Sequence, residues 1–466
     1  MVITMKTWKW IGSSVATTAL LLFGGYPLSA ESLQEAMQTT LQNHPELRTG
    51  YHNRLARKEE IRQARSGYLP QLDVIAGVGY GETQKPVDDT ADPRMLTLSL
   101  RQNLFTGFAT KGEVERQEFR VLSATHSTQA TAEFVALRTA DVYLEVLRQE
   151  ELLQLAEENL ATHLRIGDQI RLRSDAGVST TTDSDQVSSR VALARANVVA
   201  AKTNLADART NYLAVVGHLP EKLQKPEPVI EELPPSLESA ETLAVDEHPT
   251  LKSAEADLAA RQKQHDVARA PYLPVVDFEF DHNWQEDYTE VIETQEWIAL
   301  VRLRYNLFQG FRDVGRRAET AEQINEAREI RNNTQRQVVE SIRLSWMANE
   351  AVLERIGYLE DRVTTTVATA DAYAKQFNIG KRALLDLLDT EAEVIDAKKA
   401  RVEASYDGLF AQYRILNGFG GLLAAMGLEV DLDTERQPAV EAQPRQQHIV
   451  VNEAILVSPE RWAVKP

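Results

Sequence analysis

Four segments of the chain alternate between apolar and polar residues with a period of two, the pattern of a β-strand with two different faces. Their apolar positions are Leu72, Val74, Ala76, Val78 and Tyr80; Leu96, Leu98, Leu100 and Leu104; Val276, Phe278, Phe280 and Trp284; and Trp297, Ala299, Val301, Leu303, Tyr305 and Leu307. Each segment has about 10 residues, the length of a strand that crosses a bilayer at a tilt. We therefore expect Phe278, Phe280, Val301 and Leu303 to face lipid and the charged residues between them to face a lumen. The alternative is a soluble sheet, which the charges disfavour because unpaired buried charges are costly.

Two long segments without proline, 109–173 and 312–376, predict two very long helices. Each would extend for roughly 97 Å at ~1.5 Å per residue, far beyond the needs of a globular domain. Apolar residues such as Leu137, Leu144 and Leu147 recur at coiled-coil spacing. A soluble helical bundle would explain these helices but not the paired strands.

The chain contains an internal repeat. The matches are Asn43–Leu47 with Glu247–Leu251 and Gly67–Pro70 with Pro271–Pro274, at an offset of 204 residues, and Asn103–Phe105 with Asn306–Phe308 and Gly177 with Gly380, at an offset of 203. Each copy is predicted to run helix, strand, strand, long helix, helix. The predicted division is a signal peptide at 1–30, a first repeat at 31–217, a proline-rich linker at 218–237, a second repeat at 238–421 and a polar C-terminal tail at 422–466.

The first 30 residues have the pattern of an export signal. Lys6 and Lys9 precede a short apolar stretch, and Leu28–Ala30 offers a cleavage site. Cleavage there leaves 466 − 30 = 436 residues and changes the net charge from -18 to -20, because two lysines are lost. An uncleaved anchor helix is the alternative.

Composition excludes several classes of function. The chain has no cysteine, which rules out disulfides, thiolate metal sites, a cysteine nucleophile and a lipid-modified cysteine. Its acidic balance argues against nucleic acid as a partner, because phosphate contacts need clustered Lys and Arg. The glycine-rich segment Gly77–Gly81 lacks the Lys-Ser/Thr of a phosphate-binding loop, and the nine histidines are scattered. We therefore expect no enzyme, no cofactor and no certain metal site.

The duplicated order of helix, Tyr-Leu-Pro, two alternating strands, Asn-Leu-Phe-x-Gly-Phe and very long helix resembles the TolC family of trimeric outer-membrane channel-tunnel proteins. Three stretches resemble its type I secretion subgroup: Ser32–Ala36, Asp168–Ser174 and Val216–Pro220. The resemblance implies an α+β membrane protein whose homotrimer forms a 12-stranded β-barrel, continued by a long α-helical coiled-coil tunnel into the periplasm. Eight strands would enclose a barrel filled by side chains, so twelve suit an aqueous lumen.

The implied function is the exit duct of a type I secretion system in the outer membrane of a Gram-negative bacterium. The implied partners are a periplasmic membrane-fusion adaptor, an inner-membrane transporter and an exported protein cargo of the adhesin type. The same duct could serve a multidrug or metal efflux pump. A structural trimeric coiled-coil stalk is a third interpretation, which the strand alternation disfavours.

The resemblance also implies a gate near the second turn of each repeat. Arg382 matches the family's gate arginine, and Asp183 matches its partner on the neighbouring helix pair. Asp386 and Asp389 lie three residues apart, so both can share one helical face. In a trimer they would form two rings of carboxylates, where bound cations would block the channel. Without the family match, Arg382 and Asp386 are an ordinary i,i+4 ion pair at a helix start. Phe377 stands where some members have a gate tyrosine.

The turns themselves are the expected contact with the adaptor. Gly177 and Val178 belong to the first turn, and Gly380 and Lys381 to the second. We expect these tips to be exposed at the periplasmic end of the tunnel.

Overall fold

The computed structural model describes residues 30–83, 89–91, 93–177, 179–287 and 292–429. The signal peptide and most of the C-terminal tail therefore lie outside the described residues. The described residues from 30 to 428 form one compact unit.

Both repeats follow the predicted order of elements. The first has α1 (Leu33–Asn43), α2 (Pro45–Arg65), β1 (Gln71–Val78), β4 (Pro93–Thr106), α3 (Ala109–Asp175) and α4 (Thr181–Val216). The second has α5 (Leu237–Glu247), α6 (Pro249–Ala268), β5 (Val275–Asp287), β6 (Ile292–Arg304), α7 (Arg312–Asn378) and α8 (Leu384–Gly418). Shorter elements are β2 (Gly81–Thr83), β3 (Asp89–Ala91), α9 (Leu422–Ala425) and the 3-10 turns Ser66–Tyr68, Ile230–Glu232 and Ala270–Tyr272.

The four main strands form one antiparallel sheet in the order β1-β4-β5-β6. The two repeats meet in its middle, where β4 pairs with β5. The register between β4 and β5 shifts between Asn103 and Phe105, a bulge close to the end of β4. Strands β1 and β6 are the edges of this sheet.

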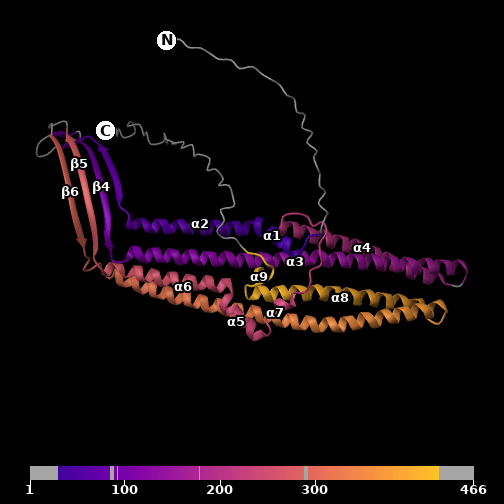
Figure 1. Cartoon of the computed structure of the whole chain (residues 1–466). Coiled ribbons are helices and arrows are strands. Elements are labelled where there is room, and N and C mark those ends of the chain that lie inside the picture. The colour runs from indigo at the N-terminus through magenta and orange to yellow at the C-terminus, as the bar shows by residue number, and fades with distance from the viewer. Residues whose placement is uncertain (1–29, 84–88, 92, 178, 288–291, 430–466) are drawn as a thin grey trace, which may run out of the picture. The chain divides into compact units, whose positions relative to one another are not determined.

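The long helices α3 and α7 leave the sheet and run to turns at the other end of the unit, where α4 and α8 return (Figure 1). Each long helix has 67 residues, so both end two residues later than the sequence predicted. Near the sheet, α3 packs against α2 and α6; farther from it, α3 packs against α4 and α8. Small residues allow close approach: Gly50 lies against Thr128, and Gly112 lies against Val267.

Each strand-to-helix connection turns sharply through two consecutive residues in the left-handed region. These are Gly107 and Phe108, with φ of 63° and 67°, and Gly310 and Phe311, with φ of 60° and 64°. A Cβ on Gly107 would meet the carbonyl oxygen of Ala270 at 2.6 Å, so glycine is required there. A phenylalanine with positive φ is strained, and both repeats have one at this connection, which we call the elbow.

The start of the predicted polar tail is folded. Leu422 and Leu423 of α9 are buried, and Leu423 donates its backbone N–H to Glu133 of α3 at 3.2 Å. The boundary expected at residue 422 therefore falls inside the folded part, which continues to Leu428. Among the described residues, no helix is long and apolar enough to cross a membrane.

Candidate channel wall and tip residues

The sheet has one apolar face. Directly opposed residues point to the same side of an antiparallel sheet, and Phe278 opposes Val301 while Val276 opposes Leu303. Val301 and Leu303 are 63% and 66% exposed, and Phe278 and its second neighbour Phe280 are half-buried. The four residues predicted to face lipid therefore lie on one continuous face, although their contact with lipid stays a prediction.

The opposite face carries cross-strand ion pairs. Arg302 lies 2.8 Å from Glu279, and Arg304 lies 3.9 Å from Asp277. Both carboxylates are largely buried within the sheet surface, whereas the two guanidiniums remain about half or more exposed. Pairing offsets the cost of burying the carboxylates and leaves a polar surface on this side of the sheet.

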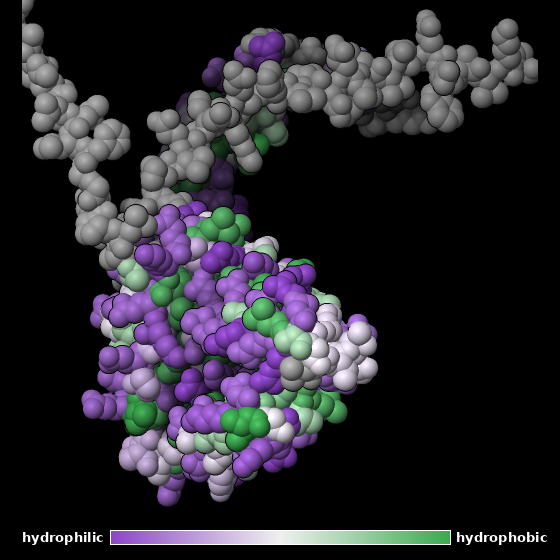
Figure 2. All heavy atoms as spheres, turned by 90° about the vertical axis from the view of Figure 1, so that its right-hand side faces the viewer, coloured by the Kyte–Doolittle hydropathy of each residue, from purple (hydrophilic) through white to green (hydrophobic). Residues whose placement is uncertain are grey.

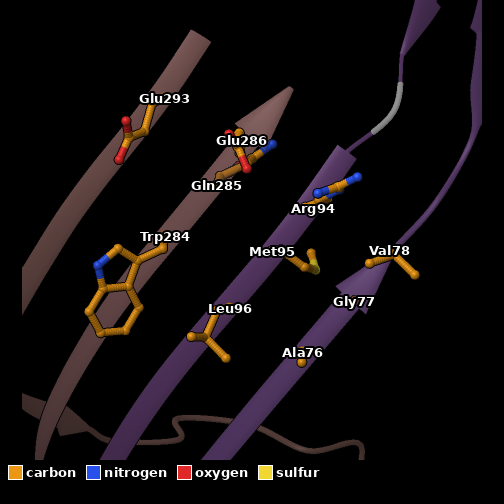
Figure 3. Close-up of a pocket in the computed structure, with 10 residues that line it drawn as sticks. All are labelled: Ala76, Gly77, Val78, Arg94, Met95, Leu96, Trp284, Gln285, Glu286 and Glu293. Atoms are coloured by element: carbon orange, nitrogen blue, oxygen red, sulfur yellow. The ribbon is translucent and has the colours of Figure 1, made fainter. Parts of the chain in front are cut away.

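Polar residues end the apolar face at the far end of the strands. A hollow of about 460 Å³ lies there, lined among others by Leu96 and Trp284 and by the charged Arg94, Glu286 and Glu293. Figure 3 shows these side chains on neighbouring strands, with the charged ones beyond the apolar ones. From Val276 to Trp284 the apolar side of β5 extends for roughly 26 Å at ~3.3 Å per residue, close to the ~25 Å apolar band of membrane barrels.

The two tip turns are open and similar in build. Gly177 and Gly380 have φ of 71° and 73°, and a Cβ on either would meet nothing within 4 Å. Lys381 is exposed, and Val178 lies outside the described residues. Figure 2 views this end, where hydrophilic residues predominate and hydrophobic ones are scattered between them. Adaptor docking here stays a prediction.

The predicted link between Arg382 and Asp183 is not formed within this chain. Asp183 is the third residue of α4, and its carboxylate accepts hydrogen bonds from Thr180 N–H and Ser179 Oγ, which lower its pKa. The Arg382 guanidinium instead contacts Gln376 at 3.2 Å and Asp386 at 3.5 Å. It also stacks over the Tyr373 ring at 4.0 Å. Within one chain a capping box holds Asp183 and Arg382 forms the i,i+4 pair with Asp386, while the gate role of Arg382 and Asp183 in a trimer stays a prediction.

An ion pair that the sequence did not indicate joins the two repeats instead. Arg190 of α4 donates to Asp389 of α8 at 2.7 Å, with side chains 33% and 55% exposed. We call this pair the clasp. Asp386 and Asp389 therefore each have a basic partner within one chain, and no cluster of three or more potential metal ligands occurs among the described residues.

An apolar cluster lies beside the clasp. It contains Ile166, Ile170, Val187, Phe377, Leu384, Leu387 and Leu388, from all four helices near the tips. Arg173 of α3 crosses to the end of α7, where it donates to the carbonyl oxygens of Phe377 and Asn378 at 3.5 and 3.3 Å. It also lies 4.5 Å from the Phe377 ring centre. Phe377, which stands where some family members have a tyrosine, thus packs between the two helix pairs.

Comparison with known proteins defines the class. The family model described as "Outer membrane efflux protein" matches residues 36–218 and 242–421. The chain is 24% identical over 423 residues to outer membrane efflux protein BepC of Brucella suis biovar 1 (strain 1330), covering 90% of this chain and 92% of that one. It is 24% identical over 408 residues to outer membrane protein TolC of Salmonella enteritidis, covering 84% and 82%.

A relative with a secretion role in its name also matches. The proteases secretion protein PrtF of Dickeya chrysanthemi is 23% identical over 425 residues, covering 85% of this chain and 90% of that one. Among solved structures, CusC, described with its transmembrane channel formation, matches with a TM-score of 0.76 at 15% identity, covering 86% and 96%. At that identity the likeness concerns the fold.

These findings define an outer-membrane transport channel rather than an enzyme. The chain belongs to the outer membrane efflux protein family, which includes TolC and its relatives. The expected fold class, family and location in the outer membrane with a large periplasmic part are confirmed.

Proposed function

We propose that the protein is the exit duct of a type I secretion system that exports a large protein, of the adhesin type, from a Gram-negative cell. Three copies form the duct. A periplasmic adaptor joins the tips to an inner-membrane transporter, which supplies the energy. The chain itself binds no cofactor and catalyses nothing.

The observation that carries a duct is the two-faced sheet. Its apolar side is exposed and its other side bears ion pairs, so one side suits lipid and the other water. Strands β1 and β6 leave unpaired edges in a single chain, and exposed edges pair with other strands. Three copies joined edge to edge would supply twelve strands, enough for an aqueous lumen.

Export of protein rather than of small molecules rests on narrower support. The stretches Ser32–Ala36, Asp168–Ser174 and Val216–Pro220 resemble the secretion subgroup, and a secretion protein is among the relatives. The second candidate, the outer-membrane part of an efflux pump, is favoured by the family's description and by the name of another relative.

Deletion of the gene separates the two candidates. The secretion role predicts that a large protein disappears from the cell surface and medium, as measured by mass spectrometry, while susceptibility to drugs and metal ions stays unchanged. Expression of the parent protein in the deletion strain should restore export. Expression of a Lys381→Glu variant tests whether this tip contacts the periplasmic adaptor. Unchanged export together with increased susceptibility would replace secretion by efflux.

A further inference from the structure

A second hollow, of about 610 Å³, lies where the sheet meets the helices. It is bounded by the first turns of α3 and α7 and by the end of α6. Its charged lining residues are Lys111, Glu115, Lys263, Asp266, Arg269 and Arg317. Four cations and two anions give the hollow a local charge of +2 in a chain whose net charge is -18.

The lysines and carboxylates of this hollow satisfy one another. Lys263 lies 2.8 Å from Glu115 and 3.9 Å from Asp266, and Lys111 lies 3.8 Å from Glu115. The hydrogen bond from Lys263 lowers the pKa of Glu115, so this carboxylate is ionised and engaged. Arg269 and Arg317 are exposed, and their guanidiniums have no hydrogen-bond or ion-pair partner among the described residues.

Comparison of the two repeats shows how this pair of guanidiniums arises. Arg269 corresponds to Arg65, which lies 3.1 Å from Glu118 in the first repeat. The residue that corresponds to Glu118 in the second repeat is Ala321, so Arg269 has lost its carboxylate. Arg317 has a valine at the matching position of the first repeat. At these two positions the second repeat therefore has one negative charge fewer and one positive charge more than the first repeat.

The hollow lies next to the apolar face of the sheet. Phe105 opposes Val276 across the strands and therefore shares its face. The Phe105 ring contacts the Phe108 ring edge to face, with centroids 5.2 Å apart. Phe108, at the strained elbow, is 62% exposed and lines the hollow together with Tyr272. Free guanidiniums therefore lie next to exposed aromatic rings at the end of the apolar face.

We propose that this hollow binds the phosphate of an anionic phospholipid, with the acyl chains along the apolar face of the sheet. Guanidinium groups bind phosphate oxygens through paired, charge-assisted hydrogen bonds. Aromatic rings such as Phe108 and Tyr272 suit the boundary between headgroups and hydrocarbon. The site rests on the assignment of the apolar face to lipid, but not on the nature of the exported cargo.

The test is a binding measurement on the purified full-length protein in a neutral detergent. Native mass spectrometry would follow titration with short-chain phosphatidylglycerol, with short-chain phosphatidylcholine and with glycerol phosphate, which has no acyl chains. The site variant is Arg269→Gln combined with Arg317→Gln. Its matched control is Arg355→Gln combined with Arg362→Gln, an equal change of charge at exposed positions of α7 far along the helix.

We expect phosphatidylglycerol to bind at least about tenfold more tightly than phosphatidylcholine, and the site variant to lose about tenfold in that affinity, because charge-assisted hydrogen bonds are lost. The control variant should bind as the parent does. Equal binding of both lipids, or unchanged affinity in the site variant, would overturn the proposal. Glycerol phosphate binding as tightly as the lipid would overturn its lipid part. Secretion is measured separately in cells. Failure of the lipid site can therefore be distinguished from failure of the proposed secretion role.

Discussion

Removal of the clasp should ease opening of the duct without unfolding the protein. The clasp joins α4 of the first repeat to α8 of the second through one contact of 2.7 Å between Arg190 and Asp389. If the proposed gate opens by separation of the two helix pairs, Arg190→Ala removes a link that opposes this movement. We expect a higher open probability and an unchanged helical content.

The magnitude follows from exposure and from the neighbouring cluster. Partly exposed ion pairs contribute about 0.2–1 kcal/mol each, so three copies contribute about 0.6–3 kcal/mol. That range shifts an open–closed equilibrium by about 3- to 150-fold. Truncating Phe377, which is 7% exposed in the apolar cluster, would cost about 3–5 kcal/mol in each copy. The cluster therefore holds the helix pairs together, and the clasp adjusts the balance between gate states.

Single-channel recording in planar bilayers at low and high salt measures this effect. Arg195→Ala is the matched control, since Arg195 lies exposed on the same helix and its side chain has no partner among the described residues. The charge exchange Arg190→Asp with Asp389→Arg should restore the behaviour of the parent. High salt should reduce the difference between parent and variant, because it screens exposed pairs. Equal opening by both alanine variants, or no rescue by the exchange, would refute the clasp.

Three further predictions concern other parts of the chain. Val301→Arg should destabilise the membrane-assembled protein by about 2–4 kcal/mol if the residue lies near the bilayer midplane. Leu300→Arg, on the opposite face, should assemble normally. Equal trimer yields of the two variants on gels would contradict the assignment of faces. Asp386→Ala with Asp389→Ala should abolish channel block by divalent or trivalent cations, and an equally strong block in recordings would remove these residues from the entrance. Burial raises the pKa of Glu133 to about 7, above the ~4.3 of an exposed glutamate, so the folded state holds an extra proton between these values. Stability should fall by about 2–4 kcal/mol as pH rises through that window. Glu133→Gln should remove this dependence in thermal unfolding, and a variant with the parent's pH profile would contradict it.

The main architecture is predictable because its signals are local and repeated. Alternation over each strand identified both faces, and the absence of proline over two long stretches predicted α3 and α7 to within two residues at their ends. Because each element occurs in both repeats, its sequence pattern occurs twice, and each copy supports the prediction made from the other. Local periodicity specifies which residues share a face, and this information survives assembly into a sheet.

Partners distant along the chain were not predictable from such signals. Arg190 and Asp389 are 199 residues apart, and nothing in their local sequences marks them as a pair. The capping role of the Asp183 side chain within its own chain was not predicted either, and the gate role that the family resemblance implies for it stays a prediction. The folded segment around Leu422 was also missed, because its burial depends on contact with Glu133 far earlier in the chain. Tertiary packing decides these contacts.

We propose that one face of the sheet lines water and that the other face meets lipid. The chain has no cysteine, so single cysteines placed in turn at positions 297–303 of β6 can be labelled without background. A membrane-impermeant maleimide requires the thiolate, which forms in water and not in hydrocarbon. In the membrane-inserted protein, positions 298, 300 and 302 should react rapidly, and positions 297, 299, 301 and 303 slowly. Uniform reactivity along the strand, or the reverse alternation, would contradict this assignment of the two faces.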